Sequence, residues 1–286
     1  MNDIIYSANA RFDDARALTE DELRTAAPSI FALTAHESRS ERFAPIPTIE
    51  VLRALAREGF MPVGVKQSTA RLPNRESHTK HLIRLRRLDE EQVRVGDTVT
   101  EMLLKNANDG SSVYDLMAGL FRVRCLNSLV VQTGTIEEVK VKHVGKDTVS
   151  KVIEGTYRVL AQAEKALAAP DAWAAIDLGH DERMVFARAA HSVRFAAANG
   201  KVTTGIKPEA LLEPRRDGDK GTDLWTTFNV VQENALRGGL IGYGRGANGN
   251  QRTFRSRPIN GIDQNVRLNK TLWTIAEDIA NTKATV

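Results

Sequence analysis

The stretch IRLR at residues 83–86 alternates apolar and cationic side chains, and the same pattern recurs as FRVR at 121–124 and VKVK at 139–142. Successive side chains of a β-strand point to opposite faces, so the alternation predicts three strands with one apolar and one cationic face each. We expect the apolar members, such as Ile83 and Leu85, to form the core side of a sheet. The six cations are then expected to share the other side.

Two-residue alternation extends outward from these stretches, from Phe60 to His143. It predicts about five strands, at 61–71, 79–88, 97–105, 117–131 and 134–143. Turn-forming residues such as Pro73-Asn74 separate the strands, and short turns favour antiparallel pairing of consecutive strands. The region is therefore expected to form an antiparallel meander.

Helical periodicity flanks the predicted sheet on both sides. Thr19 with Glu22 has the spacing of a capping box, and Thr48 is expected to be the N-cap of a second helix that starts at Ile49. The helices are expected at 20–27, 49–57, 148–168, 181–198, 222–237 and 263–280. The helix at 148–168 is long and amphipathic, and Pro170 is expected to end it.

This order of elements predicts an α+β fold. It contains an antiparallel meander of about five strands, a preceding helix, a long following helix packed on the sheet, and a C-terminal helical region. We expect three parts: an N-terminal helix and loop at 1–47, an α+β core with the basic sheet face at 48–169, and a helical region at 170–286. The last part contains a basic Gly/Arg-rich segment at 238–262.

Composition narrows the class of protein. The 286 residues include one cysteine, Cys125, so neither an internal disulfide nor a Cys-rich zinc site can form. No apolar run approaches the length of a membrane span, and the first residues lack the features of a secretory signal. We expect a cytoplasmic protein without a membrane partner.

The positive charge is concentrated in two segments, although the net charge is only +4. Residues 66–87 hold seven cations and one acid, and so do residues 236–270, which gives +6 in each. The other 229 residues therefore carry −8. Basic segments in an otherwise acidic chain favour a polyanionic partner, most often a nucleic acid.

The three cationic stretches offer a surface for such a partner. Like charges on neighbouring strands would lie about 4.5–5.5 Å apart, which is destabilising without a counter-ion. A phosphate backbone would supply that charge. The alternative is a solvent-exposed face neutralised by Glu101, Asp115 or Glu138.

The segment from Gly238 onward mixes glycine, asparagine and arginine with two aromatic residues, Tyr243 and Phe254. Arginine pairs with phosphate, and an aromatic ring can stack on a base. A dinucleotide-binding fingerprint is rejected because a helix, and not a strand, precedes the glycines. The alternative is a loop without a ligand.

Signals for catalysis are weak. His78 and His81 have a spacing that suits two metal ligands on a helix, but positions i and i+3 of a strand face opposite ways. No metal cluster, cofactor motif or catalytic constellation stands in a convincing context, so no cofactor and no catalytic residue are predicted.

Four stretches resemble a known family: NANDGSSVY at 106–114, GLFRVRCLN at 119–127, LWTTFNVVQENALRGG at 224–239 and GIDQNVRLNKTLW at 261–273. They are similar to the phage/plasmid-like domain of unknown function nine-three-two. The chain departs from it at Leu126-Asn127-Ser128, where the family usually shows Ser-Asn-Gly. The resemblance implies a mobile-element context and no settled activity.

The order helix, antiparallel meander, long helix is also similar, at the level of the fold, to single-strand annealing proteins of the RecT and Redβ type. That resemblance implies a ring or filament of identical subunits that holds DNA in a basic groove.

Together these features predict a non-enzymatic, oligomeric protein that binds single-stranded DNA and anneals it in recombination. The alternatives are an anti-defence protein that binds a host factor or mimics a nucleic acid, and a metal-dependent nuclease using Glu101, Asp109 and Asp115. The expected partners are single-stranded DNA and further copies of the chain. The residues expected to contact the nucleic acid are Lys66, Arg71, Arg84, Arg86, Arg122, Arg124, Lys140, Lys142, Tyr243, Arg245, Arg252, Phe254, Arg255 and Arg257.

Overall fold

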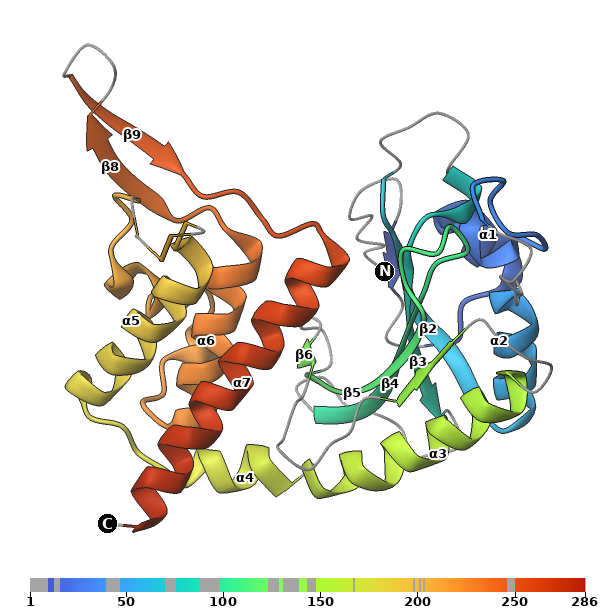
Figure 1. Ribbon diagram of the computed structural model, residues 1–286. Helices are drawn as coiled ribbons and strands as arrows, with labels where there is room; N and C mark the ends of the chain where they lie inside the picture. Colours follow the sequence, from blue (N-terminus) through green and yellow to red (C-terminus); the bar gives the residue numbers. More distant parts are fainter. Residues whose placement is uncertain are drawn as a thin grey trace. The chain divides into compact units, whose positions relative to one another are not determined.

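The computed structural model describes residues 10–12, 16–39, 47–69, 76–87, 98–122, 129–130, 139–142, 148–166, 168–197, 199–200, 202, 204–245 and 250–285. The chain forms two compact units (Figure 1). The first comprises residues 1–125 and 135–167, and the second comprises residues 126–134 and 168–286.

The first unit contains an antiparallel sheet. Its strands follow one another in space in the order β1-β2-β3-β4-β5, and β7 pairs with β5 at residues 114–116. The predicted meander is therefore confirmed, whereas β1 was not predicted. The strands are β1 (Ala10–Phe12), β2 (Phe60–Gln67), β3 (His81–Arg87), β4 (Thr98–Asn106), β5 (Tyr114–Arg122) and β7 (Val139–Val141).

The helices of this unit lie where the sequence predicts them. The capping box of Thr19 and Glu22 is formed at the start of α1. Helix α2 packs on β2, and α3 packs on β4, β5 and β7, so the long following helix covers the sheet (Figure 1). The helical elements are α1 (Glu20–Ala26), η1 (Pro28–Phe31), α2 (Thr48–Arg57), η2 (Glu76–His78) and α3 (Thr148–Ala166).

The sheet face toward α2 contains a buried polar network within an apolar core. His81 is fully buried, and its two ring nitrogens lie 2.8 Å from the Ser29 hydroxyl and 3.0 Å from the Thr48 hydroxyl. Thr48 also contacts the Tyr114 hydroxyl at 3.3 Å, and burial raises the pKa of Tyr114. His81 therefore serves the core of the fold. The neighbouring strand residues Ile83 and Leu85 are fully buried, as the alternation predicts.

The opposite sheet face carries a buried ion cluster. Arg84 and Arg86 are 3% and 4% exposed, and both pair with Glu101, which is 1% exposed. Arg84 donates from Nε and Nη2 to the two carboxylate oxygens at 2.5 and 2.9 Å, and Arg86 donates from Nε at 3.0 Å. A buried guanidinium requires such a partner, because removing an ion from water costs several kcal/mol.

The second unit is mainly helical around an aromatic core. The ring centroid of Trp173 lies 4.4 Å from that of Trp273 and 5.7 Å from that of Phe228. Pro170 lies in the first turn of α4, where proline is tolerated, and α3 ends at Ala166. The elements are β6 (Leu129–Val130), α4 (Ala168–Ala174), α5 (His180–Phe195), η3 (Pro208–Leu211), η4 (Asp217–Asp219), α6 (Leu224–Arg237), β8 (Ile241–Arg245), β9 (Gln251–Arg255) and α7 (Ile262–Thr285).

Within the described residues, none of the helices combines the length and the hydropathy that crossing a lipid bilayer requires.

The Glu101 cluster generates the first prediction. Glu101→Gln should lower the free energy of unfolding of the full chain by about 3–5 kcal/mol, because it removes the buried carboxylate charge that both Arg84 and Arg86 share. Urea denaturation followed by far-UV circular dichroism measures the loss. The matched control is Glu20→Gln, which removes a bidentate partner of Arg53 where both side chains are about half exposed. The control should cost at most about 1 kcal/mol; equal losses in the two variants would contradict the role of burial.

Candidate nucleic-acid interface

The predicted cationic stripe on the sheet does not form as one exposed surface. Arg84 and Arg86 lie on the predicted face, but they are buried and paired with Glu101, so the expectation that they are exposed is wrong. Strand alternation identifies which residues share a face and does not show whether that face meets solvent. Glu101 is one of the acids that the sequence offers to neutralise these cations, and in the structure it pairs with both arginines.

The second cationic stretch lies mostly outside the described part of the chain. The backbone of Arg122 ends β5, where it is opposite Thr98 of β4. Its side chain is outside the described part. The expectation that this stretch shares a face with Arg84 therefore stays a prediction.

The remaining sheet cations do not converge on one place. Lys140 and Lys142 are exposed at β7, where Lys140 is opposite Asp115 in the register. Lys66 lies on β2, which three strands separate from β7 in the sheet. Burial lowers the pKa of its ammonium group. Arg71 and Arg124 lie outside the described residues. Among the described residues, the sheet cations are therefore separate from one another, and the basic groove stays a prediction.

The basic segment of the second unit forms a β-hairpin, which the sequence did not predict. Strand β8 pairs antiparallel with β9, and the register places Ile241 opposite Arg255 and Tyr243 opposite Thr253. Directly opposed residues of an antiparallel pair share a face. One face of the hairpin therefore presents Ile241, Tyr243 and Arg255, with Ile241 44% and Tyr243 58% exposed.

The other face attaches the hairpin to the second unit. The Phe254 ring lies over Gly242, where a Cβ atom would meet Phe254 Cζ at 2.5 Å and Ile206 Cγ1 at 2.7 Å. Tyr243 also donates its backbone N–H to the Gly205 carbonyl at 3.2 Å. Phe254 is thus partly an anchor of the hairpin, whereas Tyr243 presents most of its ring to solvent.

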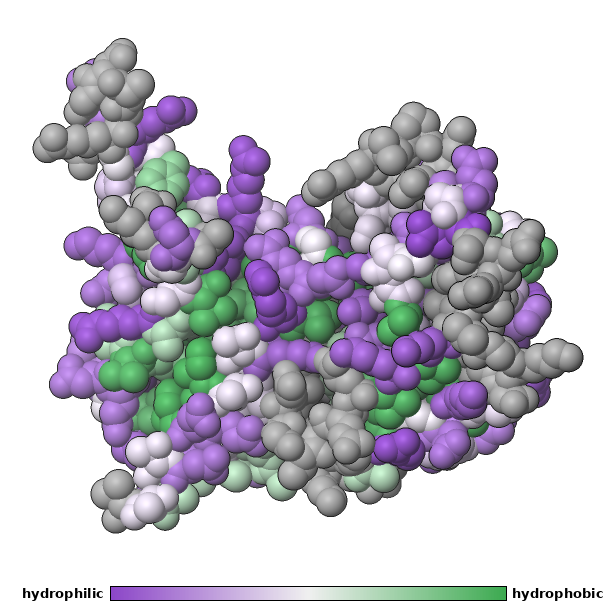
Figure 2. All heavy atoms as spheres, viewed as in Figure 1, coloured by the Kyte–Doolittle hydropathy of each residue, from purple (hydrophilic) through white to green (hydrophobic). Residues whose placement is uncertain are grey.

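Exposed arginines lie on both faces of the hairpin. Arg255 shares the face of Tyr243, and Arg252, opposite Gly244, shares the face of Phe254. Arg252, Arg255 and Arg257 are all exposed, and hydrophilic side chains are visible at the upper left of the space-filling view (Figure 2). The backbone of Arg245 is part of β8, and its side chain is outside the described part. Exposed arginines beside an exposed aromatic ring are the elements of a site for single-stranded nucleic acid.

A second group of arginines at the end of α6 was missed by the sequence reasoning. Glu233 is buried, and its carboxylate accepts from Arg216 at 2.7 Å and from Arg237 at 2.5 Å. Unlike the sheet arginines, these two side chains are 39% and 38% exposed. The adjacent pair Arg215-Arg216 was the signal that could have drawn attention to this group.

Arginines also complete the C-terminal end of α6, where the last helical carbonyls lack partners within the helix. Arg194 donates to the Ala235 carbonyl at 2.8 Å, and Arg215 donates to the Gly238 carbonyl. Gly238 has φ +64° and lies against the Arg257 backbone, so the turn into β8 depends on a glycine. The hairpin therefore leaves α6 beside five arginines: Arg194, Arg215, Arg216, Arg237 and Arg257.

The carboxylates considered for a nuclease site are separately engaged. Glu101 pairs with the two sheet arginines, and Asp115 pairs with Lys105 at 2.9 Å. Asp109 accepts a hydrogen bond from the Ser111 N–H at 2.8 Å. Over the described ranges, histidines, cysteines and carboxylates do not come together in threes as a metal site would require.

The fold and these surfaces define a class: an α+β chain in which a helix-covered antiparallel sheet is joined to a helical unit with a basic hairpin. Comparison with known proteins identifies the family of this chain. The model of the family described as "Domain of unknown function (DUF932)" matches residues 35–273, and the chain belongs to this family. The predicted family resemblance is thereby confirmed.

Two curated relatives come from Escherichia coli (strain K12). The UPF0380 protein YfjQ is 43% identical over 264 residues, which cover 92% of this chain and 92% of the relative. The UPF0380 protein YafZ is 43% identical over 262 residues, which cover 92% of this chain and 91% of the relative. No solved structure gives a significant match. The similarity to single-strand annealing proteins stays a prediction.

The packing of Phe254 on Gly242 generates the second prediction. Gly242→Ala should open the hairpin, because the added methyl group overlaps Phe254 and Ile206 and such overpacking typically costs about 1–3 kcal/mol. Trypsin should then cleave after Arg252 and Arg255 on the order of tenfold faster, since cleavage follows the population of the open form.

Gly244→Ala is the matched control, because its added methyl group would meet Phe254 at an ordinary 3.6 Å. It should leave the cleavage rate unchanged. Similar rates for the two variants would show that the hairpin is not held by the contact between Phe254 and Gly242.

Proposed function

We propose that the chain binds single-stranded DNA without sequence preference and, as a homo-oligomer, promotes the annealing of complementary strands in the recombination of mobile elements. The observation that carries this proposal is the β8–β9 hairpin. It combines the exposed Tyr243 ring with the exposed arginines Arg252, Arg255 and Arg257.

The chemistry of the hairpin suits a flexible strand. Guanidinium groups neutralise phosphates irrespective of sequence, and an aromatic face stacks on any base. The exposed Arg216 and Arg237 at the base of the hairpin add two guanidinium groups beside it; both pair with Glu233, and Arg216 also lies 3.8 Å from Asp219. A strand bound mainly through its backbone keeps most bases free to test a complementary partner.

The order of elements in the first unit supports the annealing part of the proposal. A helix, an antiparallel meander and a long helix across the sheet are the arrangement that resembles single-strand annealing proteins. Similarity of fold carries an expectation and not a function. An annealing assay with complementary oligonucleotides and electron microscopy with and without DNA test it: strands should pair faster with protein, and rings or filaments should appear.

Removal of the hairpin arginines generates the third prediction. Arg252→Gln with Arg255→Gln should weaken binding of labelled oligothymidine, and the slope of log affinity against log salt should become shallower by about 1.4, since each lost phosphate contact removes about 0.7. Fluorescence anisotropy over a range of salt concentrations measures both quantities.

The matched control removes the same charge elsewhere in the second unit. Arg188→Gln with Arg267→Gln changes two exposed arginines, on α5 and α7. The control should keep the slope of the unmodified chain. A flat salt response of the unmodified chain, or equal slopes in both double variants, would contradict binding through the hairpin.

Two other outcomes would favour the alternatives. DNA binding without faster pairing of complementary strands would favour the host-factor alternative, and magnesium-dependent DNA cleavage would favour a nuclease.

A further inference from the structure

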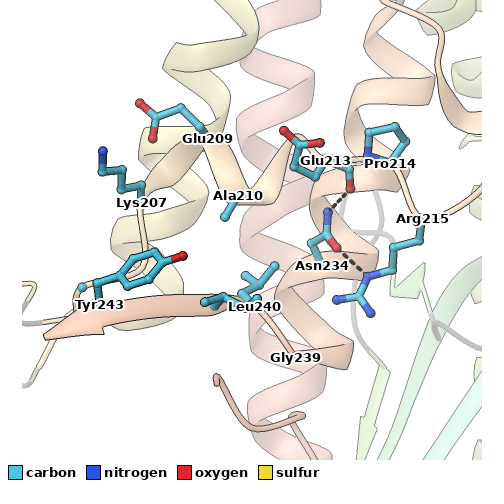
Figure 3. Close-up of a pocket in the computed structure, with 12 residues that line it drawn as sticks. Lys207, Glu209, Ala210, Glu213, Pro214, Arg215, Asn234, Gly239, Leu240 and Tyr243 are labelled. Atoms are coloured by element: carbon cyan, nitrogen blue, oxygen red, sulfur yellow. Dashed lines mark hydrogen bonds between the residues drawn. The ribbon is translucent and has the colours of Figure 1, made fainter. Parts of the chain in front are cut away.

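A pocket of about 600 Å³ opens beside the hairpin, within the second unit. Its lower wall in Figure 3 is formed by Tyr243 and Leu240, and its upper wall by η3 and the loop after it, with Ala210 and Pro214. The volume is within the range of pockets that hold small molecules. Exposed Ile241 continues the apolar wall on the hairpin side.

Hydrogen bonds fix the two sides of this pocket. Asn234 donates to the carbonyls of Leu211 and Glu213 at 3.0 and 2.8 Å and accepts from Arg215 Nε at 2.6 Å, which holds the upper wall to α6 (Figure 3). On the other side, the hydrogen bond from Tyr243 to Gly205 holds the backbone that presents the ring. The pocket is therefore preformed, and a ligand need not order its walls.

Charges around the pocket indicate which part of a nucleotide would enter. Glu209 and Glu213 both line it, and their negative charge disfavours a phosphate inside. Lys207 and the ring of Tyr243 lie at one end of the pocket, and Arg215 lies at the other (Figure 3). Arg255 shares the hairpin face of Tyr243. Cations at the rim and an aromatic ring with aliphatic side chains inside suit a flat, neutral group attached to phosphates.

We propose that this pocket holds one unstacked nucleobase of a single-stranded DNA, stacked on Tyr243, while the flanking phosphates pair with Lys207, Arg215 or Arg255. This inference rests on the proposed function and specifies what its site recognises. A base paired within a duplex is not free to enter, so the pocket selects single strands. One base per chain is held, and the other bases stay available for pairing.

The test compares an oligothymidine with an abasic oligomer of the same length and charge, by fluorescence anisotropy with the full chain. Stacking of one base is worth about 5-fold to 100-fold in affinity, so the unmodified chain should bind oligothymidine more tightly by a factor in that range. Tyr243→Leu should bring the ratio of the two affinities close to one and leave the affinity for the abasic oligomer unchanged. Tyr243→Phe should keep the ratio.

Two further variants separate the pocket from general stacking. Ala210→Trp places an indole in the pocket and should reduce the ratio as Tyr243→Leu does. Tyr157→Leu, which changes a tyrosine of α3 that is 45% exposed, should leave the ratio intact. The unchanged affinity for the abasic oligomer shows in each case that the variant is folded.

The outcomes separate this inference from the proposed function. Salt-dependent but equal binding of the two oligomers by the unmodified chain overturns the base pocket alone. A ratio that survives Tyr243→Leu or Ala210→Trp overturns it as well. Absence of binding to both oligomers overturns the proposed function together with the pocket.

Discussion

The pairing of two arginines with one buried glutamate determines which cations of this chain can meet a ligand. On the sheet, Arg84 and Arg86 close around Glu101, and all three side chains are almost completely buried. The cluster satisfies charges that would otherwise be very costly inside the protein, and it withdraws both arginines from solvent. The concentration of positive charge in residues 66–87 is therefore partly a requirement of the first unit's interior.

The second unit uses the same combination with a different result. Arg216 and Arg237 share the buried carboxylate of Glu233, but more than a third of each side chain remains exposed. Guanidinium groups held by an interior carboxylate lose little further freedom when they bind. Exposure, and not the number of charges, distinguishes a surface for a polyanion from a structural ion cluster.

Two glycines allow the close contacts that hold the hairpin on the second unit. Gly242 lets the Phe254 ring lie on the strand, and Gly238 lets the chain turn from α6 into β8 against the Arg257 backbone. Glycine in isolation is conformationally permissive. In the folded chain these two glycines allow close contacts that fix the hairpin, and Tyr243 and Arg255 are thereby held on one face beside a preformed pocket.

The sequence by itself determined the α+β class, the antiparallel meander, six of the α-helices and the core positions Ile83 and Leu85, but not α4. Two-residue and helical periodicities can be recognised locally in a sequence, because one side of each strand or helix must be buried. Only the tertiary structure decided which cations are exposed, since Glu101 reaches Arg84 and Arg86 from another strand. The group around Glu233 joins Arg216 to Arg237 across 21 positions of the chain, and contacts between distant segments leave no periodic trace in a sequence.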